Sequence, residues 1–384
     1  MGKVFFTNRD IGSTQAAIPV LKRLQDDGHT VITAASTSSP TFTALAEAGF
    51  SFIALGQYPR WDAFDGQIKM SALLRAESPD CVFVGVSASD GGSEKTAIEE
   101  AVRLGIPVVA FVESWPHGWL DQYGDRDIPI YRNVTKIAVM DEISRERLLA
   151  AGFTEDQVVV TGNSYDDTLM SSLAGRDQYR KEVRQHFGIS DEAFVVTWMV
   201  GAELDNPLED HEGAREWYGS KEADVLAEFL KLMQEGKLCY PSHEIEVIVR
   251  VKPSFSGETV QRLIKECCPS AHFDKVGHGG IPKPHLASDL VIGVKTLTLE
   301  QAAQLGIPAV SYIPNLPSPE VEPIANKLGV VLGIYERDVL AYLLAAVAAD
   351  LDAALPWIKA GLKTTTPIQD ATGNVAGVIS AFFE

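Results

Sequence analysis

Cysteine is scarce in this chain, and its spacing excludes a scaffold built on cysteine. Only Cys81, Cys239, Cys267 and Cys268 occur among 384 residues, and none of them forms the CxxC pair of a zinc or redox site. The adjacent pair at 267 and 268 does not suggest a disulfide framework either. We therefore expect a reducing, cytoplasmic setting for this protein.

Positive charge is also scarce, which bears on the partners of the protein. The chain carries 33 lysines and arginines against 52 aspartates and glutamates, a net charge of −19. A nucleic-acid surface needs many cations to neutralise phosphates, so we expect no nucleic-acid partner. The charge also disfavours docking on anionic lipid. A small anionic ligand remains compatible with it, because a helix N-terminus and one or two basic side chains suffice.

Long apolar runs are missing as well. No run reaches the roughly 18–20 residues of a membrane helix, so we expect no integral membrane segment. The first residues, MGKVFFTNRDIGS, lack the apolar core of a signal peptide. With 46% hydrophobic residues, the composition is that of a globular protein, and 384 residues favour two domains.

Short apolar stretches alternate with amphipathic stretches along the chain. The apolar stretches are continuous instead of alternating with polar residues, which is typical of parallel strands buried on both faces. We expect strands at 3–8, 29–36, 51–55, 81–86, 106–113, 134–141, 156–163, 193–201, 245–253, 286–294 and 307–313. We expect helices at 13–28, 42–50, 68–78, 94–105, 142–152, 221–236, 257–267, 298–306, 336–355 and near the C-terminus.

One phrase occurs twice, as IEEAVRLGIPVVAF at 98–111 and as LEQAAQLGIPAVSY at 299–312. In each copy a helix ends at glycine, which supplies a left-handed cap, and a buried strand begins at Ile-Pro. The repeat predicts two doubly wound α/β sheets in tandem. Ligands of such sheets bind beyond the carboxyl ends of the strands, so we expect the two sheets to face each other across a cleft.

The repeat also sets the expected domains. Residues 1–168 form a Rossmann-like acceptor or catalytic domain, and 169–190 form a helical linker. Residues 191–365 form a Rossmann-like nucleotide-donor domain, and 366–384 form a helix that crosses back to the first domain.

Three stretches carry a resemblance to the GT-B superfamily. The stretches 84–113 and 158–169 resemble UDP-N-acetylglucosamine 2-epimerases, with Asp90, Glu113 and Asn163 on that family's Asp, Glu and Asn. The stretch 288–312 is similar to the same family, to CDP-glycerol glycerophosphotransferases and to lipid-A-disaccharide synthases. There Glu300 falls on the acidic residue that binds the donor's ribose. The resemblance implies two Rossmann-like domains and a nucleotide-activated substrate.

Two departures from the epimerase pattern favour a transferase. The loop before Glu300 is Lys295-Thr296-Leu297-Thr298 where the epimerases have Ser-Gly-Gly, and the first loop has Ser89-Asp90-Gly91-Gly92 in place of His-Gly-Asp-Thr. We therefore expect transfer of a group from a UDP-sugar or other NDP-sugar to a hydroxyl acceptor. An NDP-sugar 2-epimerase or hydrolase is the first alternative, and a non-catalytic nucleotide-binding protein of the same fold is the second.

The second domain offers the candidate nucleotide site. Lys295, Thr296 and Thr298 precede or begin a helix, where free backbone N–H groups suit a pyrophosphate. Glu300 can accept hydrogen bonds from a ribose diol, although Thr298 and Glu300 also suit a plain helix start. Further candidates are Lys252, favoured over Arg250 on the same strand face, and His278 and Gly279 in a glycine-rich turn that could equally be structural.

The first domain offers the candidate catalytic groups Asp90, Glu113 and His117. Glu113 ends an expected strand, Asp90 and His117 lie in the loops after expected strands, and each could deprotonate an acceptor hydroxyl. Trp115 and Trp119 flank His117 and could stack on a ring, or they could pack in the core. Gly12 and Ser13 lie where the fold approaches the substrate, although Ser13 could simply cap a helix.

No cofactor is expected, because the NDP-sugar is the substrate. The acidic stretch 202–219 leaves a divalent metal open, and the sequence also leaves a homodimer open.

Overall fold

The computed structural model describes residues 1–37, 39–56, 64–86, 92–115, 128–201, 204, 219–239, 245–252, 255–275, 284–350, 356, 358 and 368–383. The chain forms two compact units. Unit 1 comprises Met1–Leu169 together with Pro367–Glu384, and unit 2 comprises Met170–Thr366. No helix in the described ranges is long and apolar enough to cross a membrane.

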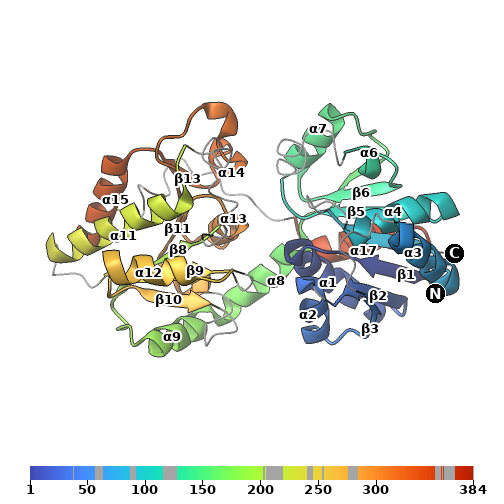
Figure 1. Ribbon diagram of the computed structural model, residues 1–384, viewed down its shortest axis with the longest axis horizontal. Helices are drawn as coiled ribbons and strands as arrows, with labels where there is room; N and C mark the ends of the chain where they lie inside the picture. Colours follow the sequence, from blue (N-terminus) through green and yellow to red (C-terminus); the bar gives the residue numbers. More distant parts are fainter. Residues whose placement is uncertain are drawn as a thin grey trace. The chain divides into compact units, whose positions relative to one another are not determined.

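Unit 1 is built on a seven-stranded sheet in which all neighbouring strands are parallel (Figure 1). The strand order is β3-β2-β1-β4-β5-β6-β7, so the chain starts in the middle and winds outward in both directions. The strands are β1 (Lys3–Thr7), β2 (Thr30–Ser36), β3 (Phe52–Leu55), β4 (Cys81–Gly85), β5 (Val108–Val112), β6 (Lys136–Val139) and β7 (Val158–Val160).

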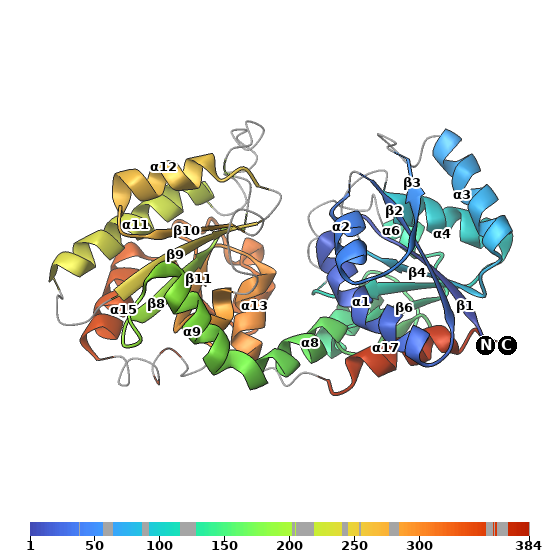
Figure 2. The same ribbon diagram turned by 90° about the horizontal axis from the view of Figure 1, so that it is seen from below.

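Helices cover both faces of this sheet, as Figure 2 shows. Successive strand residues point to opposite faces, so Phe6 and Phe83 pack on one face while Phe5 and Val82 pack on the other. The first face carries α1 (Ile11–Asp26), α2 (Pro40–Glu47) and α17 (Ala371–Ser380). The second carries α3 (Phe64–Glu77), α4 (Ser93–Leu104), α6 (Ile128–Tyr131) and α7 (Glu142–Ala150).

Unit 2 repeats this plan on a six-stranded parallel sheet of order β10-β9-β8-β11-β12-β13. Its larger core contains residues of α11, α12 and α15, and a smaller core lies under α9. The strands are β8 (Phe194–Met199), β9 (Ile245–Val251), β10 (His272–Lys275), β11 (Leu290–Gly293), β12 (Ala309–Tyr312) and β13 (Leu332–Ile334). The helices are α9 (Arg176–Phe187), α11 (Glu222–Cys239), α12 (Glu258–Cys267), α13 (Leu297–Gln304), α14 (Ile324–Lys327) and α15 (Arg337–Ala349).

The repeated phrase occupies the same place in both sheets, between α4 and β5 and between α13 and β12. Gly105 and Gly306 have φ values of 74° and 72°, the left-handed conformation that the sequence predicts. The carbonyls of Pro107 and Pro308 each accept a 2.9 Å hydrogen bond from the neighbouring strand. The two junctions are therefore structural copies, and the prediction of two doubly wound parallel sheets is confirmed.

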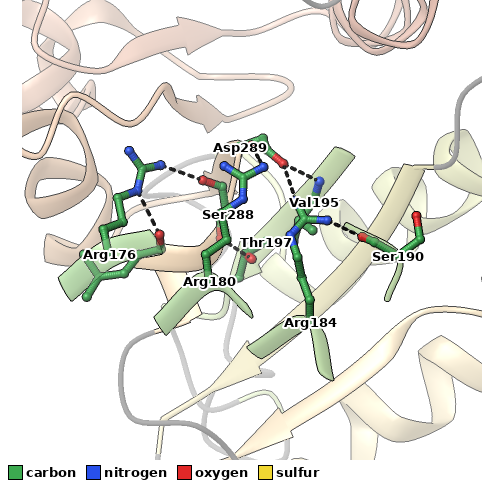
Figure 3. Close-up of polar contacts among 9 residues, drawn as sticks. Arg176, Arg180, Arg184, Ser190, Val195, Thr197, Ser288 and Asp289 are labelled. Atoms are coloured by element: carbon green, nitrogen blue, oxygen red, sulfur yellow. Dashed lines mark hydrogen bonds and ion pairs between the residues drawn. The ribbon is translucent and has the colours of Figure 1, made fainter. Parts of the chain in front are cut away.

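Three arginines one helical turn apart fix α9 to the sheet of unit 2 (Figure 3). Arg176 donates to the carbonyl of Leu286 at 3.0 Å. Arg180 and Arg184 both reach the carboxylate of Asp289, at 2.6 and 3.3 Å. The segment expected as a linker, 169–190, thus contains a helix that is part of unit 2. Before it lie α8 (Ser164–Ser172) and a short 3₁₀ helix, η2 (Leu173–Gly175).

The C-terminal helix α17 packs on α1 in unit 1. In this helix the Asn374 side chain donates to the carbonyl of Thr161 at 3.1 Å, and the backbone N–H of Thr372 donates to the Asp167 carboxylate at 2.8 Å. The rings of His29 and Phe383 lie 4.6 Å apart, and the two chain termini meet beside β1 (Figures 1 and 2).

Some details differ from the sequence-based expectation. The strands β10 and β13 were not predicted, and the helix expected at 336–355 ends at Ala349, because Asp350 is extended with φ −157°. The expectation that the two sheets face each other across a cleft stays a prediction.

Candidate functional site

Parallel strands bring their carboxyl ends to one edge of each sheet, so the residues after the strands form a cluster there. In unit 1 these residues carry two carboxyl groups, two amides and one apolar side chain. They are Asn8 after β1, Val86 after β4, Glu113 after β5, Asp141 after β6 and Asn163 after β7.

Glu113 is the central ionisable group of this edge. Burial raises its pKa to about 7, and the nearby negative charge of Asp10 acts in the same direction. Gly12 lies beside the carboxyl, since a Cβ atom there would be in ordinary van der Waals contact with Glu113 Oε1, at 3.4 Å. A carboxyl group with this pKa exchanges its proton near neutral pH, as a general acid or base must.

Ser13 hydrogen-bonds Glu113 and is itself buried. Its hydroxyl also donates to the carbonyl of Val86 at 3.0 Å. A hydroxyl has a single proton, so it accepts from protonated Glu113 while donating to Val86, and it can turn that proton toward ionised Glu113. Ser13 can therefore hydrogen-bond Glu113 whether the carboxyl is protonated or ionised. Its candidate role as a simple helix cap finds no support, since α1 begins at Ile11.

Gly85 makes this arrangement sterically possible, and sequence reasoning missed it. A Cβ atom at Gly85 would lie 2.4 Å from Ser13 Cβ and 2.8 Å from Asn8 Nδ2. The signal was present, because a glycine at the end of a buried strand often marks a close approach of another segment.

Asn163 uses both ends of its side-chain amide within the protein. Its Nδ2 donates to the backbone carbonyl of Glu113 at 2.9 Å, and its Oδ1 accepts from the backbone N–H of Tyr165 at 3.0 Å. The amide thus holds the chain at Glu113 with one of its two N–H donors.

The start of α4 buries charged residues that sequence reasoning did not single out. Glu94 and Lys95 are 0% and 4% exposed. The Glu94 carboxylate folds back on Gly92, where a Cβ atom would lie 2.0 Å from its Oε1. Burial raises the pKa of Asp10. The positive charge of Lys95 lowers it by a smaller amount, so the pKa is raised overall. The edge of unit 1 is therefore rich in buried charge.

Two of the three candidate catalytic residues, Asp90 and His117, lie outside the described residues, as does Trp119. Trp115 is described and is 2% exposed, which favours the alternative that it packs inside unit 1. Its indole N–H donates to Asp141 at 2.6 Å instead.

In unit 2 the exits of β8, β9 and β11 lie against one another. Lys252, after β9, donates to the carbonyl of Gly201 at 2.7 Å and lies 5.1 Å from the ring centre of Phe255. A Cβ atom at Gly201 would lie 2.4 Å from the carbonyl oxygen of Lys295, so glycine is required for this contact. Lys252 is exposed, so its ammonium group is accessible to an anion.

The other basic candidate on that strand is already engaged. Arg250 pairs with Asp274 at 2.5 Å, and the Asp274 side chain is fully buried. The preference for Lys252 over Arg250 therefore agrees with the geometry.

The helix α13 begins at the same edge. Thr296 is its N-cap, and its side chain accepts from the backbone N–H of Thr298 at 3.4 Å. Lys295, Thr296 and Thr298 are partly exposed, and Glu300 lies in the first turn. Hydroxyls, a cation and a helix N-terminus together suit a phosphate group. His278 and Gly279 lie outside the described residues.

A metal site is not found where the structure describes the chain: no group of three or more His, Cys, Asp or Glu residues there could hold an ion. Most of the acidic stretch 202–219 lies outside these residues.

Comparisons with known proteins find similarity at the level of the fold. No protein-family model matches the chain, and no curated protein matches it in sequence. A UDP-GlcNAc 2-epimerase from Neisseria meningitidis, solved with UDP-GlcNAc bound, is 17% identical with a TM-score of 0.63, and the match covers 99% of each chain.

Two further structures widen the comparison. S. aureus MnaA, solved with UDP, is 12% identical with a TM-score of 0.70 over 100% of this chain and 97% of that one. The MurG protein of Acinetobacter baumannii is 15% identical with a TM-score of 0.58 over 99% and 100%. At these identities the comparisons establish the fold, and the chain has the GT-B fold that its sequence resembles.

Proposed function

We propose that this chain is an enzyme that acts on a nucleotide-activated sugar, most simply a UDP-sugar, and that Glu113 moves the proton in its reaction. The observation that carries the proposal is the partly buried Glu113 carboxyl, which is hydrogen-bonded to Ser13 and has a pKa of about 7. A structural carboxylate gains nothing from such a pKa, whereas an acid–base catalyst needs it.

The proposal assigns the nucleotide to unit 2. Lys252 and Lys295 supply positive charge, Thr296 and Thr298 supply hydroxyl donors, and Glu300 supplies an acceptor for the ribose hydroxyls. The protein from Neisseria meningitidis was solved with UDP-GlcNAc and that from S. aureus with UDP, which supports a uridine nucleotide as the first ligand to test.

The leading reaction is transfer of the sugar to a hydroxyl acceptor. Ionised Glu113 accepts the proton of the acceptor hydroxyl, and that oxygen forms the new bond to the sugar carbon as the bond to the diphosphate breaks. The diphosphate leaves with the negative charge that Lys252 and Lys295 are proposed to balance. Asp90 and His117 remain alternative bases in this proposal.

A 2-epimerase or a hydrolase is the second candidate. It is favoured by the match to the Neisseria meningitidis epimerase over 99% of both chains, and by the positions of Asp90, Glu113 and Asn163 in the resembling stretches. The same Glu113 would serve as the acid–base group. A non-catalytic nucleotide-binding protein is the third candidate, and the shifted pKa of Glu113 argues against it.

Two measurements test the proposal in sequence. A thermal-shift panel of UDP, CDP, GDP, ADP and dTDP should give stabilisation by UDP, at about 2.7 kcal/mol for ligand at 100 times its Kd. Glu300→Gln should weaken binding of UDP more than binding of 2′-deoxy-UDP, because the deoxy compound lacks a hydroxyl that Glu300 is proposed to accept from. If no nucleotide stabilises the protein, both enzyme candidates fail.

Product analysis then separates the reactions. Incubation with UDP-GlcNAc alone should give no product if a hydroxyl acceptor is required. Formation of the 2-epimer, or of UDP and free sugar, without an acceptor would replace the transferase with the epimerase or hydrolase.

A further inference from the structure

Trp115 has a hydrogen bond that a tryptophan in a purely apolar core lacks. The residue lies two positions after Glu113, and its side chain is 2% exposed. Its Nε1 donates to Asp141 Oδ2 at 2.6 Å, a short bond to a charged acceptor, which is stronger than a neutral one. The chain just after Glu113 is therefore tied to another element.

That element is the start of α7. Asp141 is the N-cap of α7, and its Oδ1 accepts from the backbone N–H of Ser144 at 2.7 Å. Each carboxylate oxygen thus has one donor, the helix backbone on one side and Trp115 on the other. Because β5 and β6 are paired, with Val112 opposite Val139, the bond connects the exits of two neighbouring strands.

A second tether reaches the same segment from the next strand. Asn163, after β7, donates to the carbonyl of Glu113 itself at 2.9 Å. The main chain at 113–115 is consequently held at both of its ends, at residue 113 by β7 and at residue 115 by β6. A chain held in this way presents the Glu113 carboxyl to Ser13 in one place.

We infer that Trp115 and Asp141 are positioning residues for Glu113: their hydrogen bond fixes the turn after β5 so that the carboxyl stays beside Ser13 and only partly exposed to water. This inference rests on the proposed role of Glu113 in proton transfer. Neither residue needs to touch the substrate for it to hold. Breaking the bond should loosen the turn, admit water to Glu113 and disorder the reacting carboxyl.

Unit 2 offers a matched control for a Trp→Phe change. Trp198 in β8 is also fully buried, and its Nε1 has no hydrogen-bond partner among the residues that the structure describes. Trp198→Phe therefore removes a buried indole without removing a hydrogen bond. Trp115→Phe removes a comparable volume together with the bond to Asp141.

The test measures the titration of Glu113 directly, by NMR of protein labelled with ¹³Cδ-glutamate, with Glu113→Gln identifying its resonance. The charged groups around Glu113 stay unchanged in these variants: Asp10 acts on it from the start of α1, and Arg9 and Lys95 act on Asp10. Trp115→Phe should lower the midpoint from about 7 by about 1 unit toward the ordinary value, because burial is what raises it. Trp198→Phe should leave it unchanged.

Asp141→Asn provides a second variant that keeps the helix cap. Asparagine caps as well as aspartate, but with its oxygen on the Ser144 N–H its NH2 group takes the place of Oδ2 and cannot accept from Trp115. It should shift the midpoint in the same direction as Trp115→Phe. In turnover of UDP-GlcNAc, with a hydroxyl acceptor present where the reaction requires one, both variants should lower kcat about 10-fold with KM within about twofold, the pattern of a misplaced catalytic group.

The outcomes separate the two claims. If Asp141→Asn is folded and the Glu113 midpoint stays at its wild-type value, the positioning role is wrong, whatever the activity. If the midpoint shifts but the wild-type protein turns over no nucleotide sugar, the positioning role stands and the proposed function fails.

Discussion

The two sheets have the same topology, yet their carboxyl edges carry different chemistry. With Gly105 matched to Gly306, the buried Glu94 matches Lys295 and the buried Lys95 matches Thr296. The exit of β5 carries Glu113, whereas the exit of β12 carries the buried apolar Ile313. Unit 1 therefore holds ionisable groups that are buried or partly buried, and unit 2 leaves hydroxyls and cations within reach of a ligand.

This difference shows how a duplicated fold divides its work. The backbone junctions are nearly identical, down to the hydrogen bonds of Pro107 and Pro308. The chemistry is decided by a few side chains at the strand exits, where substitution leaves the core intact. In our proposal unit 1 transfers protons and unit 2 binds the charged nucleotide. Variants at either edge test this division.

The largest loss of turnover should come from replacing Glu113 in unit 1. Glu113→Gln keeps the shape of the side chain and its contact with Ser13 but removes the exchangeable proton. Turnover should fall by about 10³-fold, within the range for loss of a general acid–base group, while the Kd for UDP stays the same. Steady-state kinetics and calorimetry check this. A variant that retains full activity would remove Glu113 from the mechanism.

Substitutions at a matched pair of glycines should affect turnover at one edge and UDP binding at the other, by smaller factors than Glu113→Gln. Gly85 and Gly293 end the equivalent strands β4 and β11, and a Cβ atom would lie 2.4 Å from Ser13 Cβ or 2.8 Å from the carbonyl oxygen of Met199. Gly85→Ala should displace Ser13 and lower kcat about 10-fold or more with UDP binding retained. Gly293→Ala should displace the end of β8 and raise the Kd for UDP about 10-fold, since the phosphate site depends on backbone placement.

A third glycine provides the control for that pair. Gly236 in α11 has open space where a Cβ would lie, so Gly236→Ala should leave kcat and Kd unchanged and stabilise the helix by about 0.5–1 kcal/mol. If Gly85→Ala and Gly293→Ala impair binding and turnover alike, the two edges do not divide the work as proposed.

The sequence predicted all seven strands of the first sheet and the four central strands of the second, and it missed the two edge strands of the second. The buried strands are continuous apolar runs, and the repeated Leu-Gly-Ile-Pro phrase marked two junctions that the structure confirms. The missed strands β10 and β13 lie at the two ends of the second sheet, and each is short, as His-Phe-Asp-Lys and Leu-Gly-Ile. Edge strands bury less surface, so they carry a weaker apolar pattern.

For the site, the sequence located the strand exits but not which side chains meet there. Glu113 was identified because it ends an apolar strand. Its contact with Ser13 and the bond of Trp115 to Asp141 join residues far apart in the sequence, and they depend on how the helices pack on the sheet. Trp115 illustrates the limit, because a tryptophan beside a candidate acid fits a ligand wall as well as a buried tether.

The smallest expected effect is a pH dependence of stability that originates in unit 1. The pKa of Glu113 is about 7 in the folded protein against an ordinary value of 4.5, so folding favours the protonated acid. Between these values the folded state holds a proton that the unfolded state releases. The stabilisation is present below pH 4.5 and is lost as the pH rises through about 7.

Glu113→Gln isolates this contribution from those of the other acidic residues. The two pKa values correspond to about 2.5 kcal/mol between pH 5 and pH 8, and the partial exposure of Glu113 reduces this to about 1 kcal/mol. Relative to the variant, the wild-type Tm should therefore fall by about 2–4 °C over this range, the shift expected for a unit of this length. Scanning calorimetry of both proteins across this range measures the difference. Curves that stay parallel would mean that Glu113 has the same pKa in the folded and unfolded chain. The proposed contrast between the enclosed edge of unit 1 and the accessible edge of unit 2 would then lose its basis.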